Sequence, residues 1–168
     1  AGLIKAKKKH ATVYENDEAR TVDIGYVGEV TEIDTGIIVD LLNQGYVPVI
    51  APIGMGSEGE SYNINADYVA AEIAGALCAE KFLLLTDVEG VYKDFGDKSS
   101  FLSQLHADEA KEYIRSGVIA GGMIPKVEAC LRALEAGAHK THIIDGRLAH
   151  SIILEIFTSR GIGTMVLP

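Results

Sequence analysis

Two glycines followed by a proline and a lysine, Gly121-Gly122-Met123-Ile124-Pro125-Lys126, form the stretch with the clearest chemical potential. Glycine lets the backbone approach a ligand because no Cβ stands in the way. Pro125 suits the first turn of a helix, and the apolar residues after it recur with helical spacing. Lys126 is therefore predicted in a first turn, beside free N–H groups and the positive end of the helix dipole. The stretch predicts either a phosphate site or a surface lysine after an ordinary glycine loop.

Three further side chains have the chemistry of a binding site, although each also fits an ordinary structural role. Asp67 falls in the first turn of a predicted helix, where the dipole favours a carboxylate. Asp87 follows a predicted buried strand and is either a site residue or a turn residue. His142 lies in another predicted strand and is most simply a core histidine. The sequence contains neither the GxxxxGKS/T phosphate loop nor the GxSxG nucleophile elbow.

The composition is typical of a compact soluble protein and argues against several classes of function. The chain has 168 residues, of which 48% are hydrophobic, enough for one domain with a sizeable core. A net charge of −9 argues against nucleic-acid binding, the apolar runs are too short to span a membrane, and no signal peptide is visible. We expect Cys78 and Cys130, on apolar helix stripes, to be reduced core residues of a cytoplasmic protein without a protein-bound metal.

The elements that must position these residues begin with a β-hairpin. Alternating apolar and basic residues predict a strand over Leu3–Tyr14, then a polar turn over 15–20 and a second strand around 22–30. Lysines 7, 8 and 9 are interpreted as a solvated strand edge rather than a basic patch.

A helix, a strand and a second helix follow the hairpin. Asp34 is predicted to cap the first helix and Gly45 to end it. The continuous apolar run 46–53 predicts a strand buried on both sides, and the glycine-rich stretch 54–60 predicts a polar loop. Residues 63–67 lead into the second helix, which extends to Leu77. The expected apolar face of the first helix carries Ile37, Ile38, Leu41 and Leu42.

Short buried strands then alternate with amphipathic helices, which predicts an α/β fold with a mostly parallel sheet over a single domain, 1–168. Ligands in such folds bind beyond the carboxyl ends of strands. Segments 63–67, 86–92 and 118–126 are expected there. The remaining predicted strands are 82–85, 141–144 and 161–167, and a polar loop is predicted at 93–103. Helices are predicted at 107–116 and from 126 onward. A last helix is marked by its apolar residues Leu148, Ile152, Ile153 and Ile156.

Several motifs, taken together and in order, closely resemble the acetylglutamate kinase family, a branch of the amino-acid kinases. The combination of the GGMIPK, IIDGR and GIGTM motifs is narrow, whereas the Thr-Asp-Val-x-Gly motif is shared more widely. The resemblance implies the amino-acid kinase fold, a three-layer αβα arrangement with helices on both faces of the sheet. The matching stretches are 25–30, 62–67, 84–91, 121–127, 143–147, 154–158 and 161–166.

The resemblance also implies an activity in arginine biosynthesis: transfer of the γ-phosphoryl group of ATP to the side-chain carboxylate of N-acetyl-L-glutamate, giving N-acetylglutamyl 5-phosphate. The carboxylate is already ionised at neutral pH, so no general base is required. Catalysis then rests on positioning two anions and on cations around the transferring group. Mg²⁺ would accompany ATP, held mostly by the nucleotide itself.

Residue roles carried over from the family are as follows. Lys126 contacts the phosphates, Asp67 is the carboxylate that organises the active-site lysines, and Asn63 binds acetylglutamate. Residues that match an arginine effector site are His142, Glu155 and Gly161; the alternative is a core histidine beside a helix-surface glutamate. The stretches that resemble the nucleotide site are Asp87, Val88, Glu89, Gly90, Val91 and Tyr92, and Val118, Ile119, Ala120, Gly121, Gly122, Met123 and Lys126.

The chain is much shorter than members of this family. By resemblance it corresponds to their C-terminal, nucleotide-binding half, while the N-terminal half carries a second phosphate-binding lysine, most of the acetylglutamate pocket and the main contact of a homo-oligomer. We therefore expect the isolated chain to bind nucleotide, to be inactive alone and to self-associate. The alternatives are another amino-acid kinase, acting on glutamate, aspartate or a nucleoside monophosphate, and a non-catalytic nucleotide-binding regulatory module.

Overall fold

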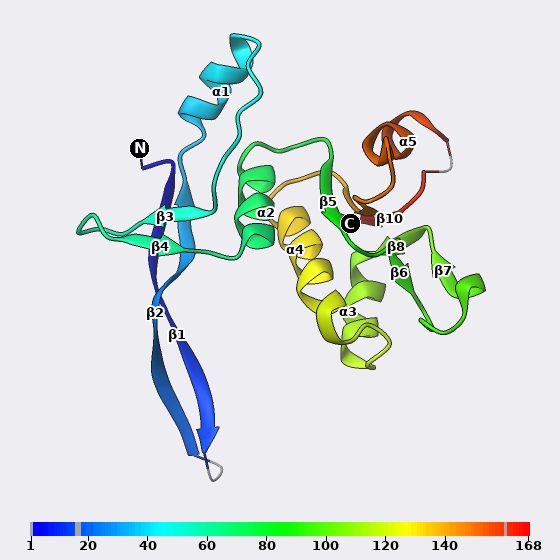
Figure 1. Ribbon diagram of the computed structural model, residues 1–168, viewed down its shortest axis with the longest axis horizontal. Helices are drawn as coiled ribbons and strands as arrows, with labels where there is room; N and C mark the ends of the chain where they lie inside the picture. Colours follow the sequence, from blue (N-terminus) through cyan, green and yellow to red (C-terminus); the bar gives the residue numbers. More distant parts are fainter. Residues whose placement is uncertain (1, 16–17, 160) are drawn as a thin grey trace. The chain divides into compact units, whose positions relative to one another are not determined.

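The computed structural model describes residues 2–15, 18–159 and 161–168, and the chain divides into two compact units, Ala1–Ile73 and Ala74–Pro168 (Figure 1). The sequence led us to expect a single domain, and the division into two compact units does not test this expectation, which stays a prediction. Within the described ranges, no helix is both long and apolar enough to cross a membrane.

The first unit is built on the predicted hairpin, which is confirmed. Strands β1 (Ile4–Glu15) and β2 (Glu18–Ile33) pair antiparallel, with register shifts that bend the ribbon. Two short strands, β3 (Ile53–Met55) and β4 (Ser61–Asn63), form a second hairpin, and the four strands close in the order β1-β2-β4-β3. The turn predicted over 15–20 is shorter than expected because pairing reaches positions 15 and 18; residues 16 and 17 lie outside the described residues.

The core of this unit lies where the two hairpins meet, and the distal half of the long hairpin extends beyond it. Lys7 and Lys8 are exposed and pair across the hairpin with Glu29 and Asp23, at 2.9 and 2.6 Å. These contacts agree with the interpretation of a solvated edge. The buried core residues are Ile4, Ala6, Tyr62, Ile64 and Val69.

Helix α1 (Gly36–Asn43) forms where the sequence predicts it, but its cap and its buried face differ. Thr35 occupies the N-cap position, while the Asp34 carboxylate accepts a hydrogen bond from the Gly36 N–H at 3.0 Å. Gly45 follows the helix with a φ of 83°, as predicted for the residue that ends it. On the expected apolar face, Ile38 is buried, whereas Ile37 and Leu42 are about half exposed.

The prediction of a buried strand over 46–53 is wrong. Residues 46–52 form no strand, and β3 begins only at Ile53. The side chains of Tyr46, Val47 and Val49 are 61%, 87% and 97% exposed. The apolar run fits a buried strand, but burial also needs neighbouring strands, and the described residues place none beside this segment.

We expect this exposed segment to make the isolated chain self-associate, because large apolar patches and unpaired extended backbone attract one another. A Val47→Thr, Val49→Thr double variant should shift sedimentation velocity profiles toward the monomer, because it makes the segment less apolar. Threonine is β-branched like valine, so the preference of the backbone for an extended conformation is kept. Phe157→Ser, which changes a side chain that is 80% exposed in the other unit, is the control. A wild-type chain that stays monomeric at all concentrations would contradict this expectation.

The stretch 54–60 contains the end of β3 and the turn that joins β3 to β4, rather than a free polar loop. Its letters at 54–59 also match the glycine spacing GxGxxG. That pattern binds a dinucleotide only where it opens a helix after a strand, and here it turns one strand into the next. Helix α2 (Ala66–Ala76) begins after β4, as predicted, and the Asn65 side chain accepts a hydrogen bond from the Tyr68 N–H at 3.2 Å.

The second unit has the predicted α/β architecture. Its sheet has the order β5-β9-β10-β8, in which β5 is parallel to β9, β10 is antiparallel to β9, and β8 is parallel to β10. Strand β8 was not predicted, and β10 starts three residues later than expected. The strands are β5 (Phe82–Thr86), β8 (Gln104–His106), β9 (Thr141–Asp145) and β10 (Thr164–Leu167).

Three helices cover this sheet: α3 (Ala107–Arg115), α4 (Ile124–Glu135) and α5 (Ser151–Phe157). Figure 1 shows α4 and α5 on opposite sides of it, so the sheet is the middle of three layers, as expected. The central strand β9 is accordingly buried from Thr141 to Ile144. Helix α4 buries an apolar stripe against the sheet: Val127, Ala129, Cys130, Leu131 and Ala133.

The polar loop predicted at 93–103 contains short regular elements. Strands β6 (Val91–Tyr92) and β7 (Phe101–Leu102) pair antiparallel, and a 3₁₀ turn, η1 (Lys98–Ser100), precedes β7. Neither cysteine forms a disulfide within the described ranges, and Cys130 is buried, as predicted. Cys78 is exposed, which corrects the expectation of a core residue: it lies beyond the end of α2, with a φ of 47°.

Candidate functional site

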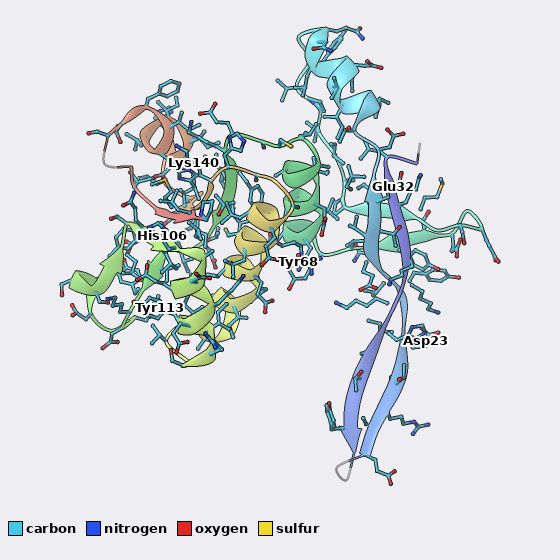
Figure 2. All side chains as sticks on the ribbon, turned by 180° about the vertical axis from the view of Figure 1, so that it is seen from behind. Asp23, Glu32, Tyr68, His106, Tyr113 and Lys140 are labelled. Carbon is cyan, nitrogen blue, oxygen red and sulfur yellow. The ribbon has the colours of Figure 1, made fainter. Side chains whose placement is uncertain are left out.

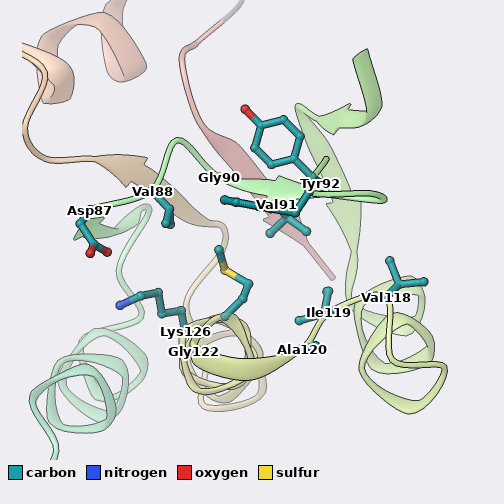
Figure 3. Close-up of a pocket in the computed structure, with 12 residues that line it drawn as sticks. Asp87, Val88, Gly90, Val91, Tyr92, Val118, Ile119, Ala120, Gly122 and Lys126 are labelled. Atoms are coloured by element: carbon teal, nitrogen blue, oxygen red, sulfur yellow. The ribbon is translucent and has the colours of Figure 1, made fainter. Parts of the chain in front are cut away.

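A pocket of about 330 Å³ lies in the second unit, between the loop after β5 and the glycine turn before α4 (Figure 3). It joins the two stretches predicted to bind nucleotide, which are about 30 residues apart in the sequence. Glu89 and Gly121 belong to those stretches but do not line the pocket, whereas Phe95 lines it and was not predicted. The lining residues are Asp87, Val88, Gly90, Val91, Tyr92, Phe95, Val118, Ile119, Ala120, Gly122, Met123 and Lys126.

One wall of this pocket is the loop that leaves β5. The Thr86 hydroxyl accepts a hydrogen bond from the Val88 N–H at 2.9 Å, which turns the chain away from the sheet. Gly90 has a φ of 153°, and a Cβ there would lie 2.5 Å from the Thr164 hydroxyl, so the position requires glycine. The Val91 N–H donates to that same buried hydroxyl at 2.8 Å. The loop is therefore anchored to β10.

The other wall is the turn that leads into α4. Ile119 is buried, and its N–H donates to the Tyr113 carbonyl at 2.9 Å. Gly121, with a φ of 57°, then opens the 3₁₀ turn η2 (Gly121–Met123), and α4 starts directly after it with Pro125 in its first turn. The predicted position of Lys126, in that first turn above the glycine turn, is confirmed.

The N-terminal end of α4 has the features of an anion site. Met123 occupies the N-cap position and makes no side-chain hydrogen bond to the helix, and the first turn contains no acidic residue. Lys126 is half-buried and forms no ion pair with any carboxylate that the structure describes. Figure 3 shows its side chain extending toward Asp87. A free ammonium group and the positive end of the helix dipole thus face the same pocket.

The rest of the pocket is apolar. Val88, Val91 and Ile119 lie between the Lys126 end and the end formed by Tyr92 and Val118 (Figure 3), and Met123 also lines the pocket. Of the described residues that line the pocket, Lys126 is the only basic one and Asp87 is the only one with a carboxylate. An elongated ligand with an apolar ring at one end and a negative charge at the other matches this arrangement.

An ion pair that the sequence did not single out lies at the same edge of the sheet. Asp145 ends β9 beside Thr86 of β5, and Arg147 Nε and Nη2 donate to its carboxylate at 2.9 and 2.8 Å. The side-chain hydrogen bonds from Arg147, followed by the backbone N–H of the same residue, lower the pKa of Asp145 to about 2.

We expect Arg147→Gln to raise the pKa of Asp145 toward its ordinary value, although the backbone N–H of residue 147 will keep part of the shift. Because the folded-state pKa is depressed, the stabilisation from this carboxylate is complete above its unfolded pKa of about 3.9 and is lost as pH falls toward 2. Carbon-13 NMR titration measures the shift directly. Asp97, whose pKa is lowered by hydrogen bonds from Ser99, should titrate identically in both proteins.

The three residues of the predicted effector site also converge. His142 on β9 and Glu155 on α5 are only 5% and 9% exposed, and His142 Nδ1 lies 2.6 Å from Glu155 Oε1. The second Glu155 oxygen accepts hydrogen bonds from the N–H groups of Ile162 and Gly163, at 2.7 and 3.0 Å. The alternative of a helix-surface glutamate is therefore wrong, because Glu155 is a buried acceptor.

Burial disfavours ionisation of Glu155, but the hydrogen bonds from Ile162, His142 and Gly163 outweigh it and hold the pKa of this carboxyl below its usual range. His142 Nε2 is buried and has no hydrogen-bond partner among the described residues. A second pocket, of about 430 Å³, opens beside this pair, and sequence reasoning missed most of its lining. It is lined by Lys81, Ser103, Gln104, Lys140, His142, Glu155, Thr158, Ser159, Gly161, Gly163 and Met165.

The predicted substrate residues lie in the first unit. Asn63 is an exposed residue at the end of β4, where its backbone pairs with Val27 and Ile53. Asp67 is half-buried in the first turn of α2, the position predicted for it. Their roles stay predictions.

Comparison with known proteins shows which protein family the chain belongs to. The model of the amino acid kinase family matches residues 1–145, and the chain belongs to this family. Acetylglutamate kinases are similar along the whole chain: that of Moorella thermoacetica is 57% identical over 166 residues, and that of Heliobacterium modesticaldum is 56% identical over 167. Each alignment covers 99% of this chain but only 56% and 57% of the relative. The chain thus spans a little over half the length of these relatives.

A solved structure supports the fold. N-acetylglutamate synthase from Neisseria gonorrhoeae, complexed with coenzyme A and L-arginine, superposes with a TM-score of 0.82 at 26% sequence identity. The match covers 99% of this chain and 37% of the synthase. The amino-acid kinase fold expected from the sequence is therefore confirmed.

Proposed function

We propose that this chain is the nucleotide-binding portion of an acetylglutamate kinase, which transfers the γ-phosphoryl group of ATP to the side-chain carboxylate of N-acetyl-L-glutamate in arginine biosynthesis. The observation that carries the proposal is a pocket with an apolar slot at one end and the unpaired Lys126 at the N-terminus of α4 at the other. A nucleotide has the matching polarity: its base is flat and largely apolar, and its phosphates are anionic. The 57% identity to an acetylglutamate kinase supports N-acetyl-L-glutamate as the acceptor of the phosphoryl group.

In this proposal the chain's own residues supply charge and position rather than proton transfer. The acceptor carboxylate is ionised at neutral pH, so the main obstacle is repulsion between it and the phosphates. Lys126 offsets negative charge on the transferring group, and the N–H groups of the α4 terminus hold the phosphates in place. Asp67 and Asn63 keep the roles proposed from the family, organising the active-site cations and binding acetylglutamate.

Mg²⁺ is the metal ion that this chemistry implies. The residues of the pocket fit a Mg²⁺ ion that is held mainly by the phosphates of the nucleotide. No group of three or more histidine, cysteine, aspartate or glutamate side chains within the described ranges is placed to hold a metal. Asp87, at the Lys126 end of the pocket, is a single carboxylate, which suits Mg²⁺ because this ion uses one or two carboxylates together with substrate phosphates. Bound there, Mg²⁺ would neutralise phosphate charge.

Calorimetry of this chain tests the proposal. We expect Mg-ATP and Mg-ADP to bind, and acetylglutamate to bind far more weakly, because the nucleotide pocket lies wholly within the second unit. Tight binding of acetylglutamate without affinity for nucleotide would contradict the assignment. A panel of acceptors, including glutamate, aspartate and nucleoside monophosphates, tested with the whole enzyme separates the proposed acceptor from those of other amino-acid kinases.

We further propose arginine as an effector at the second pocket, since the three residues matched to such a site lie together around it. The similar synthase of known structure is described as a complex with L-arginine, which supports the proposal. Arginine should perturb the His142 ring resonances in NMR spectra, and lysine at equal concentration should not. A spectrum unchanged by arginine would count against this role.

A further inference from the structure

Phe95 is an unusual residue for the rim of a binding pocket. It is the only large apolar side chain in the loop 93–100, and it is 75% exposed although it lines the pocket. Leaving an aromatic ring in water forfeits the burial that normally makes such residues stabilising. The described residues leave most of this side chain in water, so its contribution to the stability of the free protein is small.

The loop that carries Phe95 is nevertheless well built. The Asp94 N–H donates to the Ser100 hydroxyl at 3.0 Å, and that hydroxyl donates to the Asp94 carbonyl at 2.8 Å. The N–H groups of Gly96 and Asp97 donate to the side chain and carbonyl of Asp94, at 2.9 and 3.0 Å. Phe95 is therefore presented at the corner of a hydrogen-bonded turn, in a defined place.

Among the described residues, the ring of Phe95 has one aromatic contact, which is with Tyr92. It packs edge-on against Tyr92, with centroids 5.9 Å apart and planes at 81°. Tyr92 is held in turn by Phe101 at 5.2 Å, by a hydrogen bond from its hydroxyl to Glu89, and by the Lys98 ammonium 5.0 Å from its ring centroid. Tyr92 thus supports one side of Phe95, and the described residues place no second aromatic ring against the other side.

This aromatic pair stands at the end of the pocket away from the anion site. Figure 3 shows Tyr92 on the opposite side of the pocket from Asp87 and Lys126. If the phosphates of a nucleotide lie at Lys126, the base lies toward Tyr92, because the apolar slot joins the two ends. A purine or pyrimidine ring entering there meets the side of Phe95 away from Tyr92.

We propose that Phe95 is the specificity-determining residue that closes this end of the pocket, stacking on the base of the bound nucleotide. The inference rests on the proposed function and adds a residue outside the stretches matched to the family's nucleotide site. Stacking on an aromatic ring is tolerant of the base, since every base has a π face. Phe95 therefore distinguishes nucleotides from phosphate compounds without a base, rather than one base from another.

The test compares two anions in calorimetry of the whole chain: Mg-ATP and magnesium tripolyphosphate, which has no base. Phe95→Ala should weaken Mg-ATP binding about ten-fold, the effect of losing one stacking contact, and leave tripolyphosphate binding unchanged. Phe95→Tyr should bind ATP like the wild type. Phe157→Ala, at another exposed aromatic residue, is the matched control and should change neither affinity.

A second variant gives a signal that does not depend on affinity. The chain contains no tryptophan, so Phe95→Trp introduces a single tryptophan, which can be excited apart from the tyrosines. Its emission should be quenched by Mg-ATP and not by tripolyphosphate. Equal ATP affinity of Phe95→Ala and wild type, or equal loss for both anions, would overturn the role of Phe95 while leaving nucleotide binding intact. Failure of the unaltered chain to bind ATP would contradict the proposed function itself, and this inference with it.

Discussion

Replacing Lys126 by alanine is expected to weaken Mg-ATP binding to this chain by about ten- to a hundred-fold, the range for losing a hydrogen bond to a charged group. Among the described residues that line the pocket proposed for the nucleotide, Lys126 is the only basic one, and no carboxylate of the described chain neutralises it. Its loss therefore removes an attraction that no other side chain in the pocket replaces. Alanine is a good helix former, so α4 should keep its structure. Calorimetry with Mg-ATP measures the change.

Two variants make this result specific. Lys126→Arg keeps the charge in the first turn of α4 and should lose much less affinity than Lys126→Ala. Lys111→Ala removes a lysine that pairs at the surface with Glu135, 2.9 Å away, and should leave ATP binding unchanged. If Lys126→Ala binds ATP as tightly as the wild type, Lys126 is not part of a phosphate site. It is then an ordinary surface lysine after a glycine loop.

In the whole enzyme the same substitution should lower kcat more than it raises KM. An interaction that strengthens as charge moves in the transition state appears mainly in kcat, whereas one used only for binding appears in KM. A full-length Lys126→Ala enzyme with ordinary turnover would leave Lys126 a binding role alone.

The sequence predicted which two segments form the walls of the pocket beside Lys126, because each wall is specified locally. A buried strand followed by Thr86-Asp87 predicts a strand end, and Gly121 to Lys126 predict a glycine turn and a helix start. Fold-level topology then brings such segments to one edge of the sheet. Phe95 could not be found this way, because its loop is polar in composition and its contact with Tyr92 depends on the paired strands β6 and β7.

The errors share a different cause, which is that burial depends on neighbours that a sequence window does not contain. The run 46–53 is apolar enough for a buried strand, yet Val49 is almost fully exposed. The last helix shows the reverse. Its apolar residues Ile152 and Ile153 are about half exposed, while Ser151 and Glu155 are buried. Hydrophobic periodicity marked the helix α5 but could not show that its polar face meets the sheet.

Glu155 is the polar residue on which this reversed packing depends. Its carboxylate accepts hydrogen bonds from His142 on β9 and from two backbone N–H groups that lead into β10. It thereby joins a helix, the central strand and the start of the next strand through one side chain. In the unfolded chain, water molecules form hydrogen bonds with this carboxylate and with its three donors. In the folded chain the carboxylate takes the place of water as the partner of these donors, so each donor loses a partner if the carboxylate is removed.

We expect Glu155→Ala to lower the free energy of unfolding by about 3 to 5 kcal/mol, since it leaves a buried imidazole, the buried Gly163 N–H and the part-buried Ile162 N–H without an acceptor. Glu155→Gln should cost less, because its amide oxygen still accepts one of these hydrogen bonds. Urea unfolding followed by circular dichroism measures both, and Glu135→Ala, in an exposed pair with Lys111, should change stability by less than about 1 kcal/mol.

The Glu155 contribution should also depend on pH in one direction. Because its folded-state pKa lies below the ordinary value, the stabilisation is complete above the unfolded pKa of about 4.3 and is lost as pH falls through the lower folded-state pKa. The stability difference between wild type and Glu155→Gln should therefore be largest near neutral pH and shrink on acidification below about pH 4. A difference that is constant down to pH 3, or a Glu155→Ala protein as stable as the wild type, would show that this buried carboxylate does not hold α5 to the sheet.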